Sequence, residues 1–246
     1  MSEKKQNGVA LVTGAAKRVG RAIALRLADE GFDIAFTYLT SVAAAGELSE
    51  EIRKKGRNCL AIAADLRDSQ AAAETIASQV IGKFDRLDVL VNSASLYERD
   101  AAGAEAITQM QRLWAIHVES PLLLSRAFFS KLESAGGSIV NMIDLLAERP
   151  MPGYLAYCAS KAGLWNLTLG LAREMAPRVR VNGIAPGVVD WPADLPAEKR
   201  EQYLRRVPLG RAGTPDDVAG AVTFFCREAM YVTGQILRLD GGRSIG

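Results

Sequence analysis

Short runs of apolar and β-branched residues alternate along this chain with longer stretches of helical periodicity. The apolar runs predict seven strands, at 8–14, 32–38, 58–66, 87–95, 136–144, 178–187 and 234–242. Periodic patterns predict helices over 21–31, through about residue 55, through about 81, and over 104–132, 154–175 and 215–227. We expect the longest helix to bend near Pro121, since proline breaks the helical hydrogen-bond ladder.

This alternation predicts the α/β fold class. Uniformly apolar strands indicate a parallel sheet covered on both faces, and right-handed crossovers then give a doubly wound Rossmann fold of seven strands. We expect one domain over 1–246, with a loop insertion at about 188–213 that contains a short helix. The ligand crevice of such a sheet lies at the carboxyl ends of its strands.

Composition narrows the classes of partner. The chain has 246 residues and a net charge of only +2, with no basic stripe, so nucleic acid is not expected. The apolar runs are too short for a membrane span, and the polar N-terminus lacks the apolar core of a signal peptide. Three widely spaced cysteines and a single histidine predict no metal site and reduced thiols in a cytoplasmic protein.

The turn TGAAKRVG, at 13–20, follows the first predicted strand. Gly14 permits a tight turn, and the next helix would present its N-terminal N–H groups to a pyrophosphate. The glycine pattern is incomplete, because Arg18 stands where a middle glycine is often found. The alternative is an ordinary strand–helix turn with two solvated cations. In this position we favour a dinucleotide cofactor.

The second predicted strand ends in TYLTS, at 37–41, without the acidic residue that would bind the ribose hydroxyls of NAD. Lys17 and Arg18 lie nearby, and Thr37 and Ser41 offer hydroxyl groups, so NADPH/NADP+ is the expected cofactor. The alternative is that these are plain surface residues. Asp65 ends the third strand and is expected near the adenine, or else caps the next helix.

Tyr157 and Lys161 stand four residues apart, on one face of a predicted helix. A tyrosine with its usual pKa of about 10 is a poor acid–base group at neutral pH. A neighbouring ammonium and a nicotinamide cation favour the phenolate and lower that pKa. Such a tyrosine can donate a proton to a substrate that receives hydride. The alternative is a packed tyrosine beside a surface lysine.

With this pair, the sequence resembles the short-chain dehydrogenase/reductase family from about Val9 to Gly242. The matching motifs are TGAAKRVG, ADL at 64–66, VNSAS at 91–95, YCASK at 157–161, RVNGIAPG at 180–187 and YVTGQILRLDGG at 231–242. The resemblance implies NAD(P)(H) binding, catalysis by Tyr157 and Lys161, and assembly as a homotetramer or homodimer.

Three positions depart from the common family pattern. Asp144 replaces the serine thirteen residues before the tyrosine, His117 replaces an asparagine, and Arg18 replaces a glycine. Together with Ser95 and Tyr97, these departures resemble the pteridine reductase branch, which includes dihydromonapterin and dihydrofolate reductases. There the arginine reaches cofactor phosphate and substrate, the serine contacts the pterin, the aromatic ring stacks on it, and the aspartate works with the tyrosine.

The chemistry is consistent with that resemblance. Reduction of a dihydropterin adds hydride to a C=N bond and protonates the ring nitrogen. A carboxyl group at Asp144 could orient Tyr157 and share its proton, and two such acids titrate as a coupled pair with one pKa raised. The alternative for Asp144 is a simple helix or loop cap. His117 has two interpretations, a hydrogen-bonded core residue or the holder of a proton-relay water.

The expected site residues fall into three groups. The catalytic group is Asp144, Tyr157 and Lys161, and the substrate group is Arg18, Ser95, Tyr97, Asp144 and Tyr157. The cofactor group comprises Gly14, Lys17, Arg18, Val19, Thr37, Tyr38, Ser41, Asp65, Leu66, Asn92, Ser93, Ala94, Tyr157, Lys161, Pro186, Gly187 and Val188.

The main hypothesis is an NADPH-dependent reductase of a dihydropterin or dihydrofolate. The first alternative is an NADPH-dependent carbonyl reductase, such as a 3-oxoacyl thioester reductase, although the missing serine counts against it. The second is a non-enzymatic NADP(H)-binding regulatory protein, which the intact tyrosine–lysine pair disfavours.

Overall fold

The computed structural model describes residues 7–191 and 195–245. It contains a parallel sheet of seven strands in the order β3-β2-β1-β4-β5-β6-β7. The strands are β1 (Val9–Val12), β2 (Asp33–Tyr38), β3 (Cys59–Ala63), β4 (Val89–Asn92), β5 (Ser138–Met142), β6 (Arg180–Pro186) and β7 (Ile236–Leu239). The predicted doubly wound α/β fold is confirmed, and each predicted strand contains an observed one.

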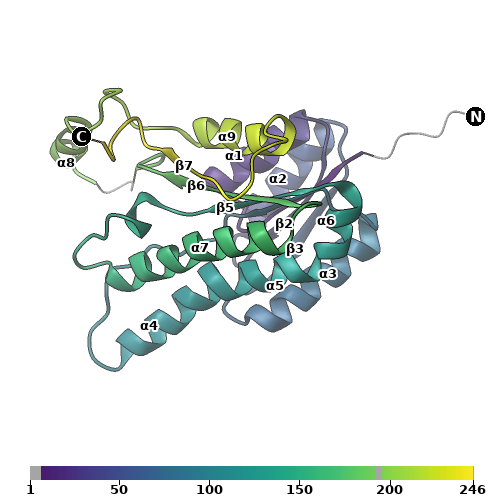
Figure 1. Ribbon diagram of the computed structural model, residues 1–246, viewed down its shortest axis with the longest axis horizontal. Helices are drawn as coiled ribbons and strands as arrows, with labels where there is room; N and C mark the ends of the chain where they lie inside the picture. The colour runs from purple at the N-terminus through teal and green to yellow at the C-terminus, as the bar shows by residue number, and fades with distance from the viewer. Residues whose placement is uncertain (1–6, 192–194, 246) are drawn as a thin grey trace, which may run out of the picture.

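Helices cover both faces of this sheet (Figure 1). One layer holds α1 (Arg18–Asp29), α2 (Val42–Lys54) and α9 (Pro215–Arg227). The opposite layer holds α3 (Ser69–Phe84), α4 (Glu105–Trp114), α5 (Ser120–Ala127), α6 (Phe129–Ala135) and α7 (Leu155–Glu174). Two large clusters of buried apolar side chains lie between the sheet and these layers, as expected for a sheet buried on both faces.

The long helix predicted over 104–132 is divided. After α4 the backbone forms a π-helical turn, η1 (Ala115–Glu119), and α5 then begins with Pro121 in its first turn. Proline has no N–H to donate, and its ring clashes with the carbonyl four residues earlier, here that of His117. The wider turn relieves this conflict, because the N–H of Ser120 bonds the carbonyl of Ala115.

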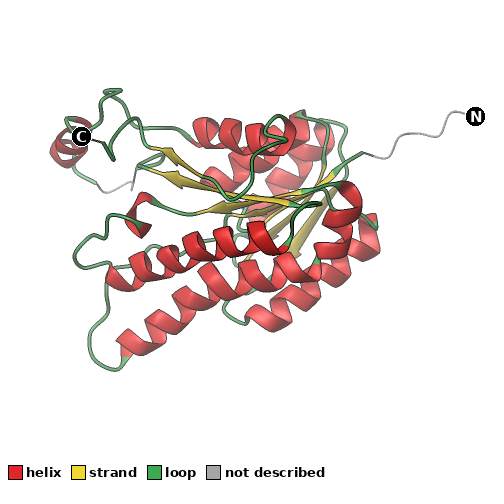
Figure 2. Ribbon diagram, viewed as in Figure 1, coloured by secondary structure: helices red, strands yellow, loops and turns green. Residues whose placement is uncertain are grey.

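The predicted loop region of 188–213 contains the short helix α8 (Ala197–Leu204). It lies with the C-terminal end of the chain at the left of Figures 1 and 2, beyond the carboxyl ends of the strands. A short 3-10 helix, η2 (Leu145–Ala147), follows β5 at the same edge. Among the described residues no helix is long and apolar enough to cross a bilayer, and no cluster of metal-ligating side chains is found.

Candidate functional site

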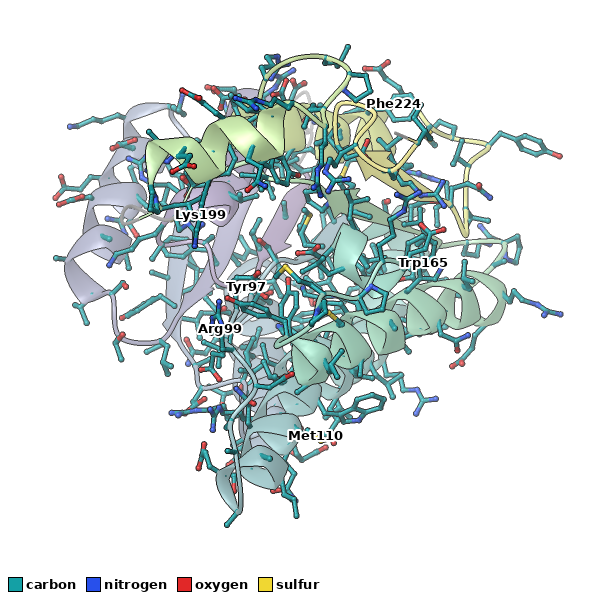
Figure 3. All side chains as sticks on the ribbon, turned by 90° about the vertical axis from the view of Figure 1, so that its left-hand side faces the viewer. Tyr97, Arg99, Met110, Trp165, Lys199 and Phe224 are labelled. Carbon is teal, nitrogen blue, oxygen red and sulfur yellow. The ribbon has the colours of Figure 1, made fainter. Side chains whose placement is uncertain are left out.

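Figure 3 looks onto the edge at which the strands end, with Tyr97 and Arg99 between α8 above and α4 below. At this edge, β5 leads into η2 and places Asp144 opposite Tyr157 of α7. The Tyr157 hydroxyl donates a hydrogen bond to Oδ2 of Asp144 over 2.8 Å. The other carboxylate oxygen accepts the N–H of Leu146 over 2.8 Å, which caps η2. Asp144 is therefore both a cap and the partner of the tyrosine.

Burial decides the protonation of this pair. Asp144 is enclosed by its surroundings, which raises its pKa despite the hydrogen bonds from Leu146 and Tyr157. Burial also raises the pKa of Tyr157 well above its usual value, and the charge and hydrogen bonding of Asp144 act in the same direction. The two groups thus favour forms that retain a proton between them.

Lys161 lies on the same face of α7 and is fully buried. Its ammonium group donates to the carbonyl of Met142 over 2.8 Å and lies 5.8 Å from the centroid of the Tyr157 ring. Burial lowers the pKa of Lys161 to about 8. Burial and the carboxyl group of Asp144 dominate the pKa of Tyr157, and its lowering by Lys161 together with a nicotinamide cation stays a prediction.

His117 is buried in the π-turn and uses both ring nitrogens. Nε2 lies 2.9 Å from the hydroxyl of Ser95 and accepts the N–H of Leu96 over 3.3 Å. Nδ1 lies 2.8 Å from the hydroxyl of Ser160, which donates to the carbonyl of Tyr157 over 2.7 Å. Because Leu96 donates to Nε2, the proton sits on Nδ1. With both nitrogens bonded to protein, the contacts favour the core-residue interpretation.

An aromatic cluster forms one wall of the site. Tyr97 stacks on Tyr154 with ring centroids 4.7 Å apart and an interplanar angle of 14°. It meets the edge of Tyr157 at 4.9 Å. Its side chain is half exposed, at 51%. The ring expected to stack on a substrate is therefore held against a second tyrosine and still has accessible surface.

The glycine turn is tied to the second strand. The N–H of Gly14 donates to the hydroxyl of Thr37 over 3.0 Å, and Thr37 is buried. That oxygen already accepts a hydrogen bond inside the protein, and a role of Thr37 toward a 2′-phosphate stays a prediction. Lys17 is exposed and Ser41 is partly exposed, so both remain available.

Arg18 occupies the position where the glycine pattern often has its middle glycine, and it adopts a left-handed backbone conformation with φ of 53°. This conformation is costly for a residue with a Cβ atom. Its side chain is exposed and pairs with Asp190 in the loop after β6, with Nε and Oδ2 2.5 Å apart. The arginine thus connects the glycine turn to the loop expected to lie over the substrate.

The remaining cofactor residues occupy the same edge with different exposure. Asp65 does not cap α3, as its alternative interpretation held, because Asp68 does; Asp65 instead pairs with Arg67 at 2.5 Å. Asn92 is buried and donates to Asn141 over 2.8 Å, while its own carbonyl oxygen has no partner. The other members lie at or beside strand ends and helix starts: Val19, Tyr38, Leu66, Ser93, Ala94, Pro186, Gly187 and Val188.

Sequence reasoning missed four contributors. Tyr154 supports Tyr97, Ser160 links His117 to the backbone of Tyr157, and Asp190 holds Arg18. Tyr203 of α8 accepts the N–H of Val188 over 3.0 Å. Tyr154 and Ser160 flank the tyrosine motif closely enough to have been considered. Asp190 and Tyr203 come from the loop after β6 and from α8, and the approach of this region to the sheet has no local sequence signal.

Comparison of sequences places this architecture among known proteins. The family model described as enoyl-(acyl carrier protein) reductase matches residues 14–244. A 3-oxoacyl-(acyl-carrier-protein) reductase FabG of Staphylococcus aureus is 35% identical, with 97% of this chain and 98% of the relative covered. An uncharacterized oxidoreductase of Methylorubrum extorquens is 37% identical, with 97% and 98% covered.

Solved structures give the same relationship. A short-chain dehydrogenase/reductase from Serratia marcescens has a TM-score of 0.89 and 35% identity, covering 98% of this chain and 100% of that one. A blue fluorescent protein from a metagenomic library, in complex with NADPH, has a TM-score of 0.90 and 34% identity with the same coverage. The chain therefore belongs to the short-chain dehydrogenase/reductase family of oxidoreductases.

Proposed function

We propose that this protein is an NADPH-dependent reductase that transfers hydride to the C=N bond of a pteridine, either a dihydropterin or a dihydrofolate. The observation that carries the proposal is the hydrogen bond between the hydroxyl of the buried Tyr157 and the carboxyl group of Asp144. Hydride addition to C=N leaves a ring nitrogen that needs a proton, and this pair retains one.

The residues at the glycine turn fit a dinucleotide. A Cβ at Gly14 would lie 2.8 Å from the Cα of Ala94. Only glycine therefore fits where the glycine turn packs against the backbone after β4. The first turn of α1 has no side-chain cap, so its N–H groups can meet phosphate oxygens. Lys17, Arg18 and Ser41 are the candidates for the 2′-phosphate. The structural neighbour that binds NADPH supports this choice.

When bound, NADPH supplies the hydride, and this chain supplies the proton and the positions. Tyr157 would donate its hydroxyl proton toward the substrate nitrogen, and Asp144 would replace that proton from its own carboxyl group. Lys161 would hold positive charge beneath the tyrosine, fixed by the carbonyl of Met142. The exposed surface of Tyr97 would stack on the flat heterocycle, and Ser95 and Arg18 would contact its polar edge.

A second candidate is the reduction of a 3-oxoacyl thioester. The relatives from Staphylococcus aureus and Aquifex aeolicus carry the name 3-oxoacyl-(acyl-carrier-protein) reductase, which favours this candidate. These names give the pteridine proposal no support. The same tyrosine could protonate a ketone oxygen. The carboxyl group at position 144 counts against it, because a hydroxyl suits that oxygen better.

One assay panel separates the candidates. NADPH oxidation is followed at 340 nm with dihydrobiopterin, dihydromonapterin, dihydrofolate and acetoacetyl-CoA. We expect turnover of at least one dihydropteridine with kcat/KM above that for the thioester. Turnover of the thioester alone would contradict the proposal and support the second candidate. NADPH binding without turnover of any substrate would instead support a regulatory protein.

We also propose that the protein is a cytoplasmic homo-oligomer, a tetramer or a dimer. Four large apolar side chains on α4 and α7 are exposed: Ile107, Met110, Trp114 and Leu155. A face of this kind is typical of a subunit interface. Light scattering coupled to size-exclusion chromatography tests this, and a monomer at micromolar concentration would contradict it.

A further inference from the structure

An open cavity of about 700 Å³ lies where the end of α8 meets the turn after β7. Five residues line it: Arg205, Arg206, Val207, Pro208 and Arg243. Three of these are arginines, so guanidinium groups dominate the lining. Arg205 and Arg206 are exposed and Arg243 is half-buried. The cavity therefore offers a concave surface with a concentrated positive charge.

The cavity is built by two segments locked together. Asp240 accepts the N–H groups of Gly242 over 3.0 Å and Ser244 over 2.6 Å, which closes the turn that carries Arg243. The N–H of Leu209 donates to the carbonyl of Gly241 over 3.1 Å. A Cβ at Gly242 would lie 2.9 Å from Pro208, so the segments touch directly. The two segments that carry the arginines are therefore held together by backbone hydrogen bonds and direct contact.

The positive charge in this cavity has no paired carboxylate in the described part of the chain. Within 7–191 and 195–245, no carboxylate pairs with Arg205, Arg206 or Arg243. Nε of Arg243 is buried and has no hydrogen-bond partner. By contrast, Arg211 and Arg238 nearby in sequence are paired with Asp217 and Glu148. Guanidinium groups that lack a carboxylate partner favour a ligand with carboxylate or phosphate oxygens.

One tyrosine connects this cavity to the catalytic pair. The guanidinium carbon of Arg243 lies 5.5 Å from the ring centroid of Tyr203. Burial raises the pKa of Tyr203, with Arg243 opposing the change and the charge of Asp144 adding to it. The hydroxyl of Tyr203 also accepts the N–H of Val188 over 3.0 Å, so this side chain lies beside the carboxyl end of β6. A substrate whose reactive ring reached Tyr157 could extend its tail past Tyr203 to the arginines.

We propose that this arginine cavity binds the anionic end of the substrate's tail. This inference rests on the proposed function, under which the tail is the glutamate portion of a dihydrofolate. Each glutamate added to that tail adds one carboxylate. The same oxyanion chemistry would hold the phosphates of a thioester carrier if the second candidate substrate were the native one. The cavity selects for an anionic tail and contributes nothing to binding the pterin ring.

The test compares substrates that share a ring but differ in tail. KM is measured for dihydrobiopterin, dihydrofolate and dihydropteroyl-triglutamate with the native enzyme and with Arg205→Gln/Arg206→Gln. We expect KM for the triglutamate to be the lowest in the native enzyme and to rise about tenfold in the variant, with kcat retained. KM for dihydrobiopterin should stay within about twofold in the variant.

The matched control is Arg173→Gln/Arg178→Gln, which removes the same charge from exposed sites beyond the other end of the strands. It should leave all three KM values unchanged. Calorimetric binding of dihydropteroyl-triglutamate to the enzyme with NADP+ gives a readout independent of turnover. Equal KM and Kd values for native enzyme and variant would overturn the inference, even if dihydrobiopterin is reduced and the proposed function holds.

A second arm covers failure of the proposed function itself. If only thioesters are reduced, acetoacetyl-CoA is compared with acetoacetyl-N-acetylcysteamine, which has no phosphate. A KM increase in the variant confined to the CoA ester would support the oxyanion cavity with phosphate as its ligand. Equal effects on both esters would contradict it.

Discussion

The hydroxyl of Tyr157, a buried residue, donates a hydrogen bond of 2.8 Å to the carboxyl group of the partly buried Asp144. The same carboxyl group accepts the N–H of Leu146 through its other oxygen. The chemistry of the tyrosine and the geometry of the loop after β5 therefore depend on one side chain. A substitution at Asp144 can separate these two functions.

Asp144→Asn keeps an oxygen for Leu146 but removes the acid. We expect kcat for the preferred dihydropteridine to fall about 100-fold, because Tyr157 loses its proton source, while NADPH affinity is retained. Stopped-flow reduction under single-turnover conditions measures the chemical step. Asp144→Ser is the companion variant, and it should lose pteridine activity while gaining activity on acetoacetyl-CoA. Unchanged pteridine turnover in both variants would rule out the proposed role of the carboxyl group.

Lys161→Met should change how stability depends on pH. Burial lowers the pKa of Lys161 from 10.5 to about 8, so the folded state disfavours the ammonium form. Stability from this group is fully present above pH 10.5 and is lost as pH falls through about 8. The difference corresponds to roughly 3 kcal/mol at most.

Urea unfolding at pH 6 and pH 10 tests this expectation. Relative to the native protein, Lys161→Met should be more stable at pH 6 than at pH 10, while its activity is abolished. Arg173→Met, at an exposed site on α7, serves as a control for removing a cation. A difference between native and variant protein that is independent of pH would contradict the buried-charge explanation.

His117→Asn should reduce the sensitivity of the protein to mild acid. Burial lowers the pKa of His117 well below 6.5, with the charge of Lys161 adding to the effect. Stability from the neutral ring is present above the unfolded value of about 6.5 and is lost as pH falls through the lowered folded value. Thermal unfolding from pH 7 to pH 4.5 should therefore show a smaller decline in the variant. Loss of one limb of the kcat–pH profile would instead indicate that the histidine relays protons.

Arg18→Gly should separate stability from cofactor binding. Glycine adopts a φ of 53° without the Cβ penalty, so we expect the free energy of unfolding to rise by about 1 kcal/mol. The exposed ion pair with Asp190 contributes little to offset this gain. KM for NADPH should rise, since a phosphate contact is lost. Asp190→Asn is the control, and equal NADPH affinity in Arg18→Gly and the native enzyme would contradict the phosphate role.

The fold was predictable because the apolar runs and helical periods are long and regular. The strand ends were predicted two to three residues too long at some carboxyl ends, where apolar residues such as Leu66 continue beyond the ladder. The π-turn was not predictable from periodicity, because it arises from the conflict between Pro121 and the carbonyl of His117. Periodicity records which face is buried, and it does not record how one turn closes.

The candidate site was predictable to the extent that it follows strand ends. Asp144, Tyr157 and Lys161 meet because α7 follows β5 in the chain, with only η2 between them. The hydrogen bond from Gly14 to the hydroxyl of Thr37 was not predictable, because it depends on the register between β1 and β2. Tyr203 and Arg243 come together only when the segment after α8 meets the turn after β7, a tertiary event with no sequence signal of its own.

The cap formed by Asp144 has a consequence for how substrate preference can diverge. The loop after β5 needs only a side-chain oxygen to accept the N–H of Leu146, and serine and aspartate both meet that need. Fold stability therefore places a weak constraint on the choice between them, whereas proton chemistry places a strong one. Under the proposed function, a substitution at this one position would therefore change the substrate preference while the cap of the loop after β5 is kept.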